Sequence, residues 1–324
     1  MIKGHGDDIY QYQGITSDFS SNICQNPAAS RTVMDYLLQR PDLLAHYPEP
    51  EAWSLEQMIA EREGVSPDNV IVTSGATESI YLIAQTFRYQ PQIPQPTFSE
   101  YADACRMFTP NTKSKNSIWL CNPNNPTGRM LSAGKLDDAL FYFNLVIVDQ
   151  SYEHYTHQPL LTAAEAIGKK KLILLHSMTK TYAVPGLRLG YMVTSKPLAS
   201  QLRKNLRPWS VSSLAIEAGK FLLQHDELIC RPNLAEAQQL RSKLCQIEGI
   251  SAEGTHTNFM LCNIETATAH DLKDYLAHEH HILIRDCSNF EGLTPHHFRV
   301  AAQTPAENDV LVAAIRQFVK SVVK

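Results

Sequence analysis

Two kinds of segment alternate along the first two thirds of the chain. Short, continuous apolar runs are typical of strands that are buried on both faces, and they occur at 69–73, 117–121, 145–149 and 171–176. Amphipathic stretches with helical spacing lie between or before them, at 54–64, 77–87 and 99–108. Strands that alternate with helices predict a mostly parallel sheet with helices on both faces.

The C-terminal third has a different pattern. Two helical stretches (198–210 and 214–225) lead into apolar runs that predict strands at 258–264, 281–290 and 297–303. A last helix is predicted to start with a capping box at Thr304, and we expect it to bury Val310, Leu311, Ala314, Ile315, Phe318 and Val322. The sequence therefore predicts an α/β protein with a large domain at 28–230 and a small α+β domain made of 1–27 and 231–324.

Composition narrows the class of protein. Of the 324 residues, 44% are hydrophobic and 19% are charged, which is typical of a folded globular chain. The formal net charge of -4 disfavours a nucleic-acid or anionic-membrane surface, and no signal sequence or membrane-spanning run is recognisable. The seven cysteines are scattered without a CxxC pair, which predicts reduced thiols in a cytoplasmic protein. No metal site is expected, because HEHH at 278–281 lacks the spacing of metal ligands.

Polar loops follow four of the predicted strands, at 74–79, 122–128, 148–152 and 176–180. Ligands of open parallel sheets bind beyond the carboxyl ends of the strands, so these loops predict one shared site. Lys180 ends the last of them, and Arg188 follows closely. A desolvated lysine near another cation has a lowered pKa and can attack a carbonyl, for which the aldehyde of pyridoxal phosphate is the obvious partner.

The cofactor's ring makes demands that the sequence can meet. A buried carboxylate must keep the ring nitrogen protonated, and Asp149 ends an apolar strand. Asn125 and Tyr152 could donate to the phenolate oxygen, and Tyr101 could stack on the ring.

The cofactor's phosphate needs a second set of groups. Gly75, Ala76 and Thr77 open a predicted helix after a strand, where backbone N–H groups favour an anion. Ser177 and Arg188 could add a hydroxyl and a guanidinium group.

The ordered motifs SGATES, PTFSEY, NPNNPTG, VDQSY, SMTK and GLRLGY resemble the class I/II aminotransferase family of pyridoxal-phosphate enzymes. The resemblance implies the fold of type I pyridoxal-phosphate enzymes, with Lys180 as the Schiff-base lysine and Asp149 as the partner of the ring nitrogen. It also implies that Arg299 binds the substrate carboxylate. Tyr47 would reach the cofactor phosphate of a neighbouring subunit, in a homodimer with shared active sites.

A narrower resemblance lies at the two ends of the chain. The segments HGDDIY, DFSSNI and IRDCSNFEGL are similar to the threonine-phosphate decarboxylase branch, which acts in cobalamin side-chain synthesis. The sister branch is histidinol-phosphate aminotransferase. Both branches act on a small phosphorylated amine, which implies a second phosphate pocket with His5, Asn22 and Arg285 as candidates.

Some positions depart from the family pattern. Gln150 stands where an acidic residue is usual, Ser151 stands where alanine is common, and the stretch between Tyr101 and Asn125 is shorter than expected. The expected reaction is decarboxylation of a small phosphorylated amino acid. Two alternatives are transamination by the same residues and a non-catalytic, cofactor-binding regulatory module.

Overall fold

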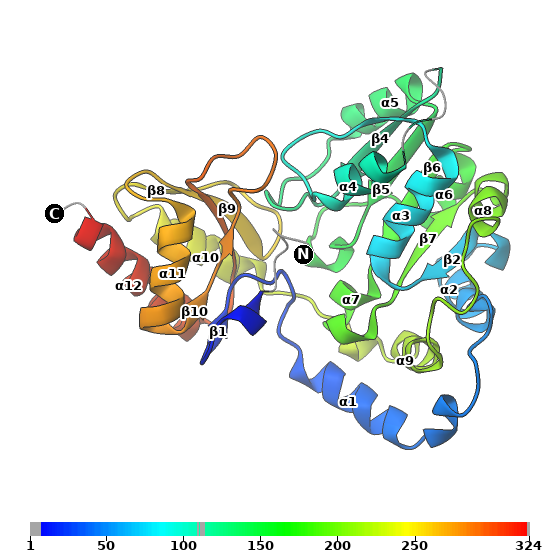
Figure 1. The fold of residues 1–324 in the computed structure, drawn as a ribbon, viewed down its shortest axis with the longest axis horizontal. Coiled ribbons are helices and arrows are strands. Elements are labelled where there is room, and N and C mark those ends of the chain that lie inside the picture. The colour runs from blue at the N-terminus through cyan, green and yellow to red at the C-terminus, as the bar shows by residue number, and fades with distance from the viewer. Residues whose placement is uncertain (1–7, 109, 111–113, 323–324) are drawn as a thin grey trace.

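The computed structural model describes residues 8–108, 110 and 114–322. A larger and a smaller part lie side by side (Figure 1). The larger part contains a six-stranded sheet in the order β2-β7-β6-β5-β4-β3. These strands are β2 (Val70–Thr73), β3 (Gln90–Gln92), β4 (Asn116–Cys121), β5 (Leu145–Asp149), β6 (Leu172–His176) and β7 (Gly190–Thr194). Strand β7 runs antiparallel to both neighbours, whereas β3 to β6 are parallel. The prediction of a mostly parallel sheet is therefore confirmed.

Alternate residues of each central strand enter separate hydrophobic clusters on the two faces, which explains why the strands are apolar throughout. In β5, Val146 and Val148 pack with one group of helices, and Leu145 and Ile147 pack with the other. The first group comprises α1 (Pro27–Leu38), α2 (Trp53–Glu63), α5 (Ala133–Tyr142), α6 (Ala163–Gly168) and α9 (Ser213–Leu223). The second group comprises α3 (Gly75–Phe87), α4 (Glu100–Met107) and α8 (Lys196–Arg203).

The smaller part contains an antiparallel sheet in the order β11-β12-β9-β8. Its strands are β8 (Ile250–Ala252), β9 (Phe259–Ile264), β11 (Arg285–Asp286) and β12 (His297–Ala301), and its helices are α10 (Leu234–Leu244), α11 (Ala269–His280) and α12 (Pro305–Val322). The run 281–290, predicted as one strand, forms two short ones. Strand β10 (Ile282–Leu283) pairs with β1 (Ser17–Asp18), whereas β11 pairs with β12, because the run passes from one partner to another.

Helix α12 begins with the predicted capping box. Thr304 N donates to Glu307 Oε2 (3.1 Å), and Glu307 N donates to Thr304 Oγ1 (3.4 Å). Leu311, Ala314, Ile315 and Phe318 are buried as predicted. The prediction is wrong for Val310 and Val322, which are exposed, and it misses the buried Val312 and Val319. The buried side of α12 is formed by the residues at 311, 312, 315 and 319, and Val310 lies on the solvent-facing side of the helix.

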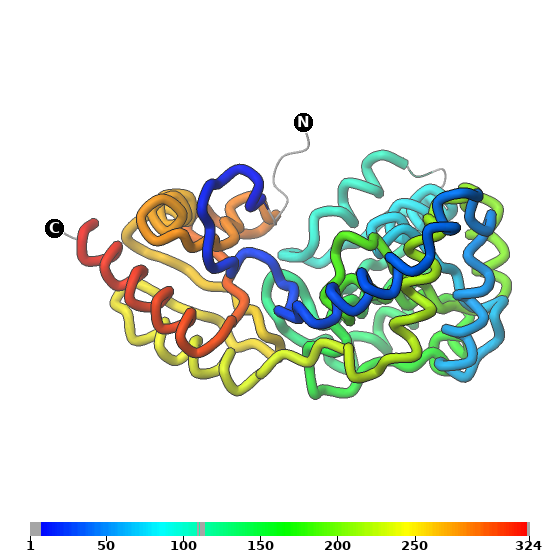
Figure 2. Tube along the Cα trace, turned by 90° about the horizontal axis from the view of Figure 1, so that it is seen from below, coloured from blue at the N-terminus to red at the C-terminus, as the bar shows by residue number. Residues whose placement is uncertain are grey.

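The chain crosses between the two parts twice within the described residues. The first crossing runs from β1 to α1, and the second runs from the short helix η6 (Asp226–Leu228) to α10. Both can be followed in Figure 2, the first in blue and the second in yellow-green. No helix among the described residues is long and apolar enough to span a membrane.

A disulfide joins Cys24 in the first crossing to Cys230 in the second. The expectation that all seven cysteines are reduced thiols is therefore wrong for this pair, and the remaining five are free. The two residues are 206 positions apart in the sequence, so only the tertiary fold brings them together.

Candidate active site

A pocket opens beyond the carboxyl ends of β4, β5 and β6, and both parts of the molecule contribute to its wall. It brings together most of the residues predicted to hold the cofactor: Ala76, Thr77, Tyr101, Asn125, Asp149, Tyr152, Ser177, Lys180 and Arg188. It also contains three of the predicted substrate residues: Asn22, Arg285 and Arg299. The roles of these side chains remain predictions.

Asp149 lies buried at the end of β5, where two donors fix its carboxylate. The Tyr101 hydroxyl donates to Oδ2 (2.7 Å), and Ser151 N donates to Oδ1 (2.8 Å). Burial raises the pKa of Asp149, although the hydrogen bonds from Ser151 and Tyr101 oppose this shift. Among the described residues no lysine or arginine forms an ion pair with this carboxylate. A protonated ring nitrogen fits this environment because it would supply a compensating positive charge.

Tyr101 has contacts that the sequence did not predict. Its ring stacks on Trp119, with the ring centroids 5.8 Å apart, while its hydroxyl reaches Asp149. Burial raises the pKa of Tyr101 well above its ordinary value, so the hydroxyl remains a donor. Stacking of this ring on the cofactor stays a prediction, and holding the Asp149 carboxylate is a second role that the geometry provides.

A hydrogen-bonded group fixes the side of the pocket near the small part. Arg299 Nη1 donates to Asn125 Oδ1 (2.5 Å), and Arg299 Nη2 donates to the carbonyl oxygen of Ser20 (2.5 Å). Asn22 Nδ2 donates to the hydroxyl of Tyr152 (3.2 Å). Burial raises the pKa of Tyr152 to about 12, so its hydroxyl is protonated at neutral pH.

The start of α3 forms a cradle for an anion. Gly75 has φ +80°, and a Cβ atom there would lie 2.8 Å from Arg188 Nη2, so glycine allows the guanidinium group to approach. Glycine at position 190 likewise leaves room for the backbone at the start of α3, since a Cβ atom there would lie 2.7 Å from Ala76 N. Thr179 Oγ1 is buried without a hydrogen-bond partner and belongs to a residue of the pocket wall. A helix N-terminus, a guanidinium group and unpaired hydroxyl oxygen suit a phosphate group.

Lys180 lies in the short helix α7 (Met178–Thr181), which follows β6 directly. The side chain is half-buried, and its Nζ lies 5.9 Å from the centroid of the Tyr152 ring. The Lys180 backbone is also fixed, because the Tyr155 hydroxyl donates to the Lys180 carbonyl oxygen (3.1 Å). Lys180 thus lies in the same pocket as Asp149 and the two arginines of the small part.

Two predicted site residues in the described part of the chain are not part of the pocket wall. Gly75 acts through the space it leaves for Arg188. Tyr47 is 85% exposed and contacts Trp209, so within one chain it does not reach the pocket. His5 lies outside the described residues.

Several residues of the pocket wall were not predicted from the sequence: Ser20, Ser21, Ile23, Phe98, Ser99, Cys121, Ser151, Thr179, Pro185 and Phe290. Most of them adjoin a predicted motif. Thr179 directly precedes Lys180, and Phe290 lies in the IRDCSNF run, so adjacency was the signal that could have indicated them.

The departure at Gln150 has a structural explanation. Its side chain accepts from Leu161 N and donates to Leu161 O, both at 3.0 Å, and so closes the loop that follows β5. Gln150 is not part of the pocket wall, so the departure from an acidic residue does not change the lining of the pocket.

The chain belongs to the aminotransferase class I and II family, whose family model matches residues 15–112 and 107–315. This finding confirms the family predicted from the ordered motifs, and with it an enzyme of the pyridoxal-phosphate-dependent kind.

Relatives from both predicted branches are similar to this chain. The threonine-phosphate decarboxylase of Salmonella typhimurium (strain LT2) is 30% identical to this chain over 92% of it and 90% of the relative. The crystal structure of L-threonine-O-3-phosphate decarboxylase from Porphyromonas gingivalis is 33% identical, covers 94% of this chain and 99% of its own, and has a TM-score of 0.88. The histidinol-phosphate aminotransferase of Caldanaerobacter subterraneus subsp. tengcongensis is 28% identical over 84% of each chain.

Proposed function

We propose that this protein is a pyridoxal-phosphate-dependent decarboxylase of a small phosphorylated amino acid, with threonine phosphate as the substrate. Such a reaction makes it a lyase, and the cytoplasmic location expected from the sequence belongs to the same proposal. The substrate is the one for which the relatives from Salmonella typhimurium and Porphyromonas gingivalis are named.

One observation carries the proposal. Arg285 and Arg299 are direct cross-strand partners on β11 and β12, both are buried, and both belong to the pocket wall. Like charges directly opposite each other on neighbouring strands repel, and an anionic ligand in the pocket would offset this repulsion. A substrate with a carboxylate at one end and a phosphate at the other provides one anionic group for each arginine.

The remaining side chains have roles that follow from their positions. When bound, the cofactor draws electrons from the bonds at the amine-bearing carbon of the substrate. Asp149 would hold the proton on the ring nitrogen, and Arg299 would orient the carboxylate. Lys180 would bind the cofactor covalently and return a proton to the substrate carbon.

Transamination is the alternative reaction, because the histidinol-phosphate aminotransferase is similar in sequence over most of this chain. The two reactions differ in which bond at the substrate carbon breaks, the bond to the carboxylate or the bond to hydrogen. A transaminase also needs a 2-oxo acid as second substrate, whereas a decarboxylase needs none. A non-catalytic regulatory module is a poorer explanation, because the pocket holds the complete set of lysine, carboxylate and arginines.

We expect Arg285→Ala to weaken binding of the phosphorylated amino acid by about 1.5–3 kcal/mol, the typical contribution of a hydrogen bond to a charged group. The guanidinium group lies over Phe290 and donates to Asn289, so its orientation in the pocket is fixed. Titration calorimetry with threonine phosphate and with threonine measures the effect. The affinity for threonine should change little.

A matched control for this substitution is Arg241→Ala, since Arg241 lies in the same part of the molecule but donates to the carbonyl oxygens of Ala252 and Glu253. It should leave the ratio of the two affinities unchanged. If Arg285→Ala weakens binding of both ligands equally, Arg285 is structural and the proposed phosphate subsite is wrong.

We also propose a homodimer. Large apolar side chains that lie exposed gather along α1, the chain that follows it and the start of α2: Met34, Leu38, Leu44, Tyr47 and Trp53. Trp209 is likewise exposed, and its ring contacts that of Tyr47 in a tilted arrangement with the ring centroids 5.4 Å apart. Such a surface is typical of one that a second subunit covers.

Light scattering at micromolar concentration is expected to give twice the mass of one chain. Tyr47→Ala should leave the dimer in place but weaken cofactor retention, by about 1.5–3 kcal/mol if Tyr47 donates a hydrogen bond to the partner's phosphate group. A fully active monomer would contradict this part of the proposal.

A further inference from the structure

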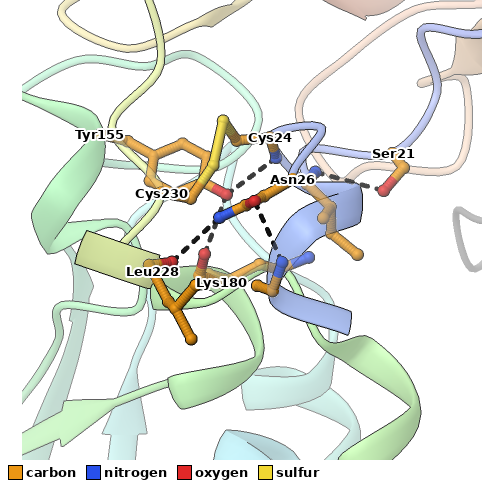
Figure 3. Close-up of a disulfide and its surroundings, with 9 residues drawn as sticks. Ser21, Cys24, Asn26, Tyr155, Lys180, Leu228 and Cys230 are labelled. Carbon is orange, nitrogen blue, oxygen red and sulfur yellow. Dashed lines mark hydrogen bonds between the residues drawn. A yellow bond between two sulfur atoms is a disulfide. The ribbon is translucent and has the colours of Figure 1, made fainter. Parts of the chain in front are cut away.

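The Cys24–Cys230 disulfide lies where the two crossings between the parts of the molecule run side by side (Figure 3). The two Cα atoms are 6.3 Å apart. A hydrogen bond from Asn26 Nδ2 to the carbonyl oxygen of Leu228 (2.9 Å) joins the same two segments without the sulfur atoms. Within the described residues, this disulfide and one side-chain hydrogen bond join the crossings directly.

Both cysteines are also attached to the helix that carries Lys180. Cys24 N donates to the Tyr155 hydroxyl (2.9 Å), which in turn donates to the Lys180 carbonyl oxygen (3.1 Å). Cys230 N donates to the carbonyl oxygen of Thr181 (2.7 Å). The disulfide thus joins the two crossings, and these hydrogen bonds connect both of them to the backbone of α7. Figure 3 shows the connection through Tyr155 and Lys180.

The segment just before Cys24 forms part of the pocket wall. Ser20, Ser21, Asn22 and Ile23 all line the pocket, and Ile23 N donates to Ser21 Oγ (3.2 Å). A covalent anchor at residue 24 therefore limits how far this wall can move away from Tyr152, to which Asn22 donates. The disulfide also joins the two segments through which the chain passes between the parts of the molecule.

We propose that Cys24 and Cys230 form a reversible thiol–disulfide modification site whose redox state sets the mobility of the pocket wall and of the two crossings. In the oxidised form the crossings move as one unit with α7. In the reduced form the first crossing is held at this point by hydrogen bonds alone, and residues 20–23 gain freedom. This inference does not depend on which amino acid the pocket binds.

A dithiol reductant is the class of co-reactant that the site would take. Cys24 is half-buried and Cys230 is buried, so a thiolate has better access to the sulfur of Cys24. Attack there forms a mixed disulfide and releases the Cys230 thiolate. The second thiol of the reductant then displaces Cys24, which leaves two protein thiols and an oxidised dithiol. Two electrons and two protons pass from the dithiol to the protein.

The test compares the whole cofactor-loaded protein, incubated either with oxidised glutathione or with dithiothreitol that is then removed. Thiol titration after denaturation should give five thiols in the oxidised sample and seven in the reduced one. Hydrogen exchange followed by mass spectrometry should show the amides of 20–26 and 228–233 exchanging at least tenfold faster after reduction. The amides of β5 and β6, at the centre of the large sheet, should not change.

Three variants complete the test. Cys24→Ser should exchange at the rate of the reduced protein whether or not dithiothreitol is added, and Cys230→Ser should do the same if it folds. Cys245→Ser changes a free, exposed cysteine and should show the exchange rates of the unmodified protein, with one thiol fewer in each sample. Seven thiols in the sample treated with oxidised glutathione would overturn the proposal. So would a rise from five thiols to seven with no change in exchange, because the disulfide would then restrain nothing.

Discussion

Lys180→Ala is expected to lower turnover by about a thousandfold or more while leaving the fold unchanged. The side chain lies half-buried in the pocket, but the backbone of α7 is held by other atoms. Lys180 N donates to the Ser177 carbonyl oxygen, and the Lys180 carbonyl oxygen accepts from Tyr155. Alanine keeps both bonds and favours a helix, so the loss should be chemical rather than structural.

Borohydride reduction followed by peptide mass analysis measures the covalent attachment directly. The unmodified protein should retain the cofactor on the peptide that contains Lys180, and Lys180→Ala should retain none. Lys196→Ala is a matched control, because Lys196 is an exposed lysine paired with Asp68. Covalent trapping that persists in Lys180→Ala would assign the attachment to another lysine.

Asp149→Asn is expected to lower turnover by roughly 10²–10⁴-fold with the cofactor still bound. Removing one partner of a buried charge pair typically costs about 3–5 kcal/mol, and each 1.36 kcal/mol corresponds to about a tenfold change in rate. The amide keeps the size of the carboxylate, but it cannot balance a proton on the ring nitrogen. The phosphate cradle at Gly75 and Arg188 is distant in the sequence from this change and should keep the cofactor in place.

Tyr101→Phe is a graded control for this experiment. It removes the hydroxyl that donates to Asp149 Oδ2 but keeps the ring that packs on Trp119 and the second donor, Ser151 N. Turnover should fall by about 10–150-fold, which corresponds to the loss of one charge-assisted hydrogen bond. Near-normal turnover of a pure Asp149→Asn sample would show that the protonation of the ring nitrogen depends on other groups.

Four of the six strands of the large sheet could be predicted because their signal is local, whereas β3 (Gln90–Gln92) and β7 (Gly190–Thr194) were missed. Each apolar run, such as Leu145–Asp149, is short, continuous and followed by a polar loop, and all four predicted runs are strands. Pairing partners are not local, and they account for the error in the run 281–290. Ile282–Leu283 and Arg285–Asp286 belong to one apolar run, but they pair with segments that lie far apart in the sequence.

The pocket residues show the same difference between local sequence signals, which could be read, and contacts between distant segments, which could not. The motif residues around Lys180 could be found because residue type and order are diagnostic for the chemistry. The contact between Tyr101 and Asp149 could not be predicted, since it depends on how α4 packs against the end of β5. The Cys24–Cys230 disulfide had no signal in the spacing of the cysteines, because it forms between two crossings that only the complete fold brings together.

The most direct test of the proposed function is to incubate the cofactor-loaded protein with carboxyl-labelled threonine phosphate and no 2-oxo acid. The release of labelled CO2 is measured together with the phosphorylated amine product. The account predicts one CO2 for each substrate consumed, with no dependence on added 2-oxoglutarate. No CO2, together with a 2-oxo acid product that appears only when 2-oxoglutarate is added, would contradict it and identify the protein as a transaminase.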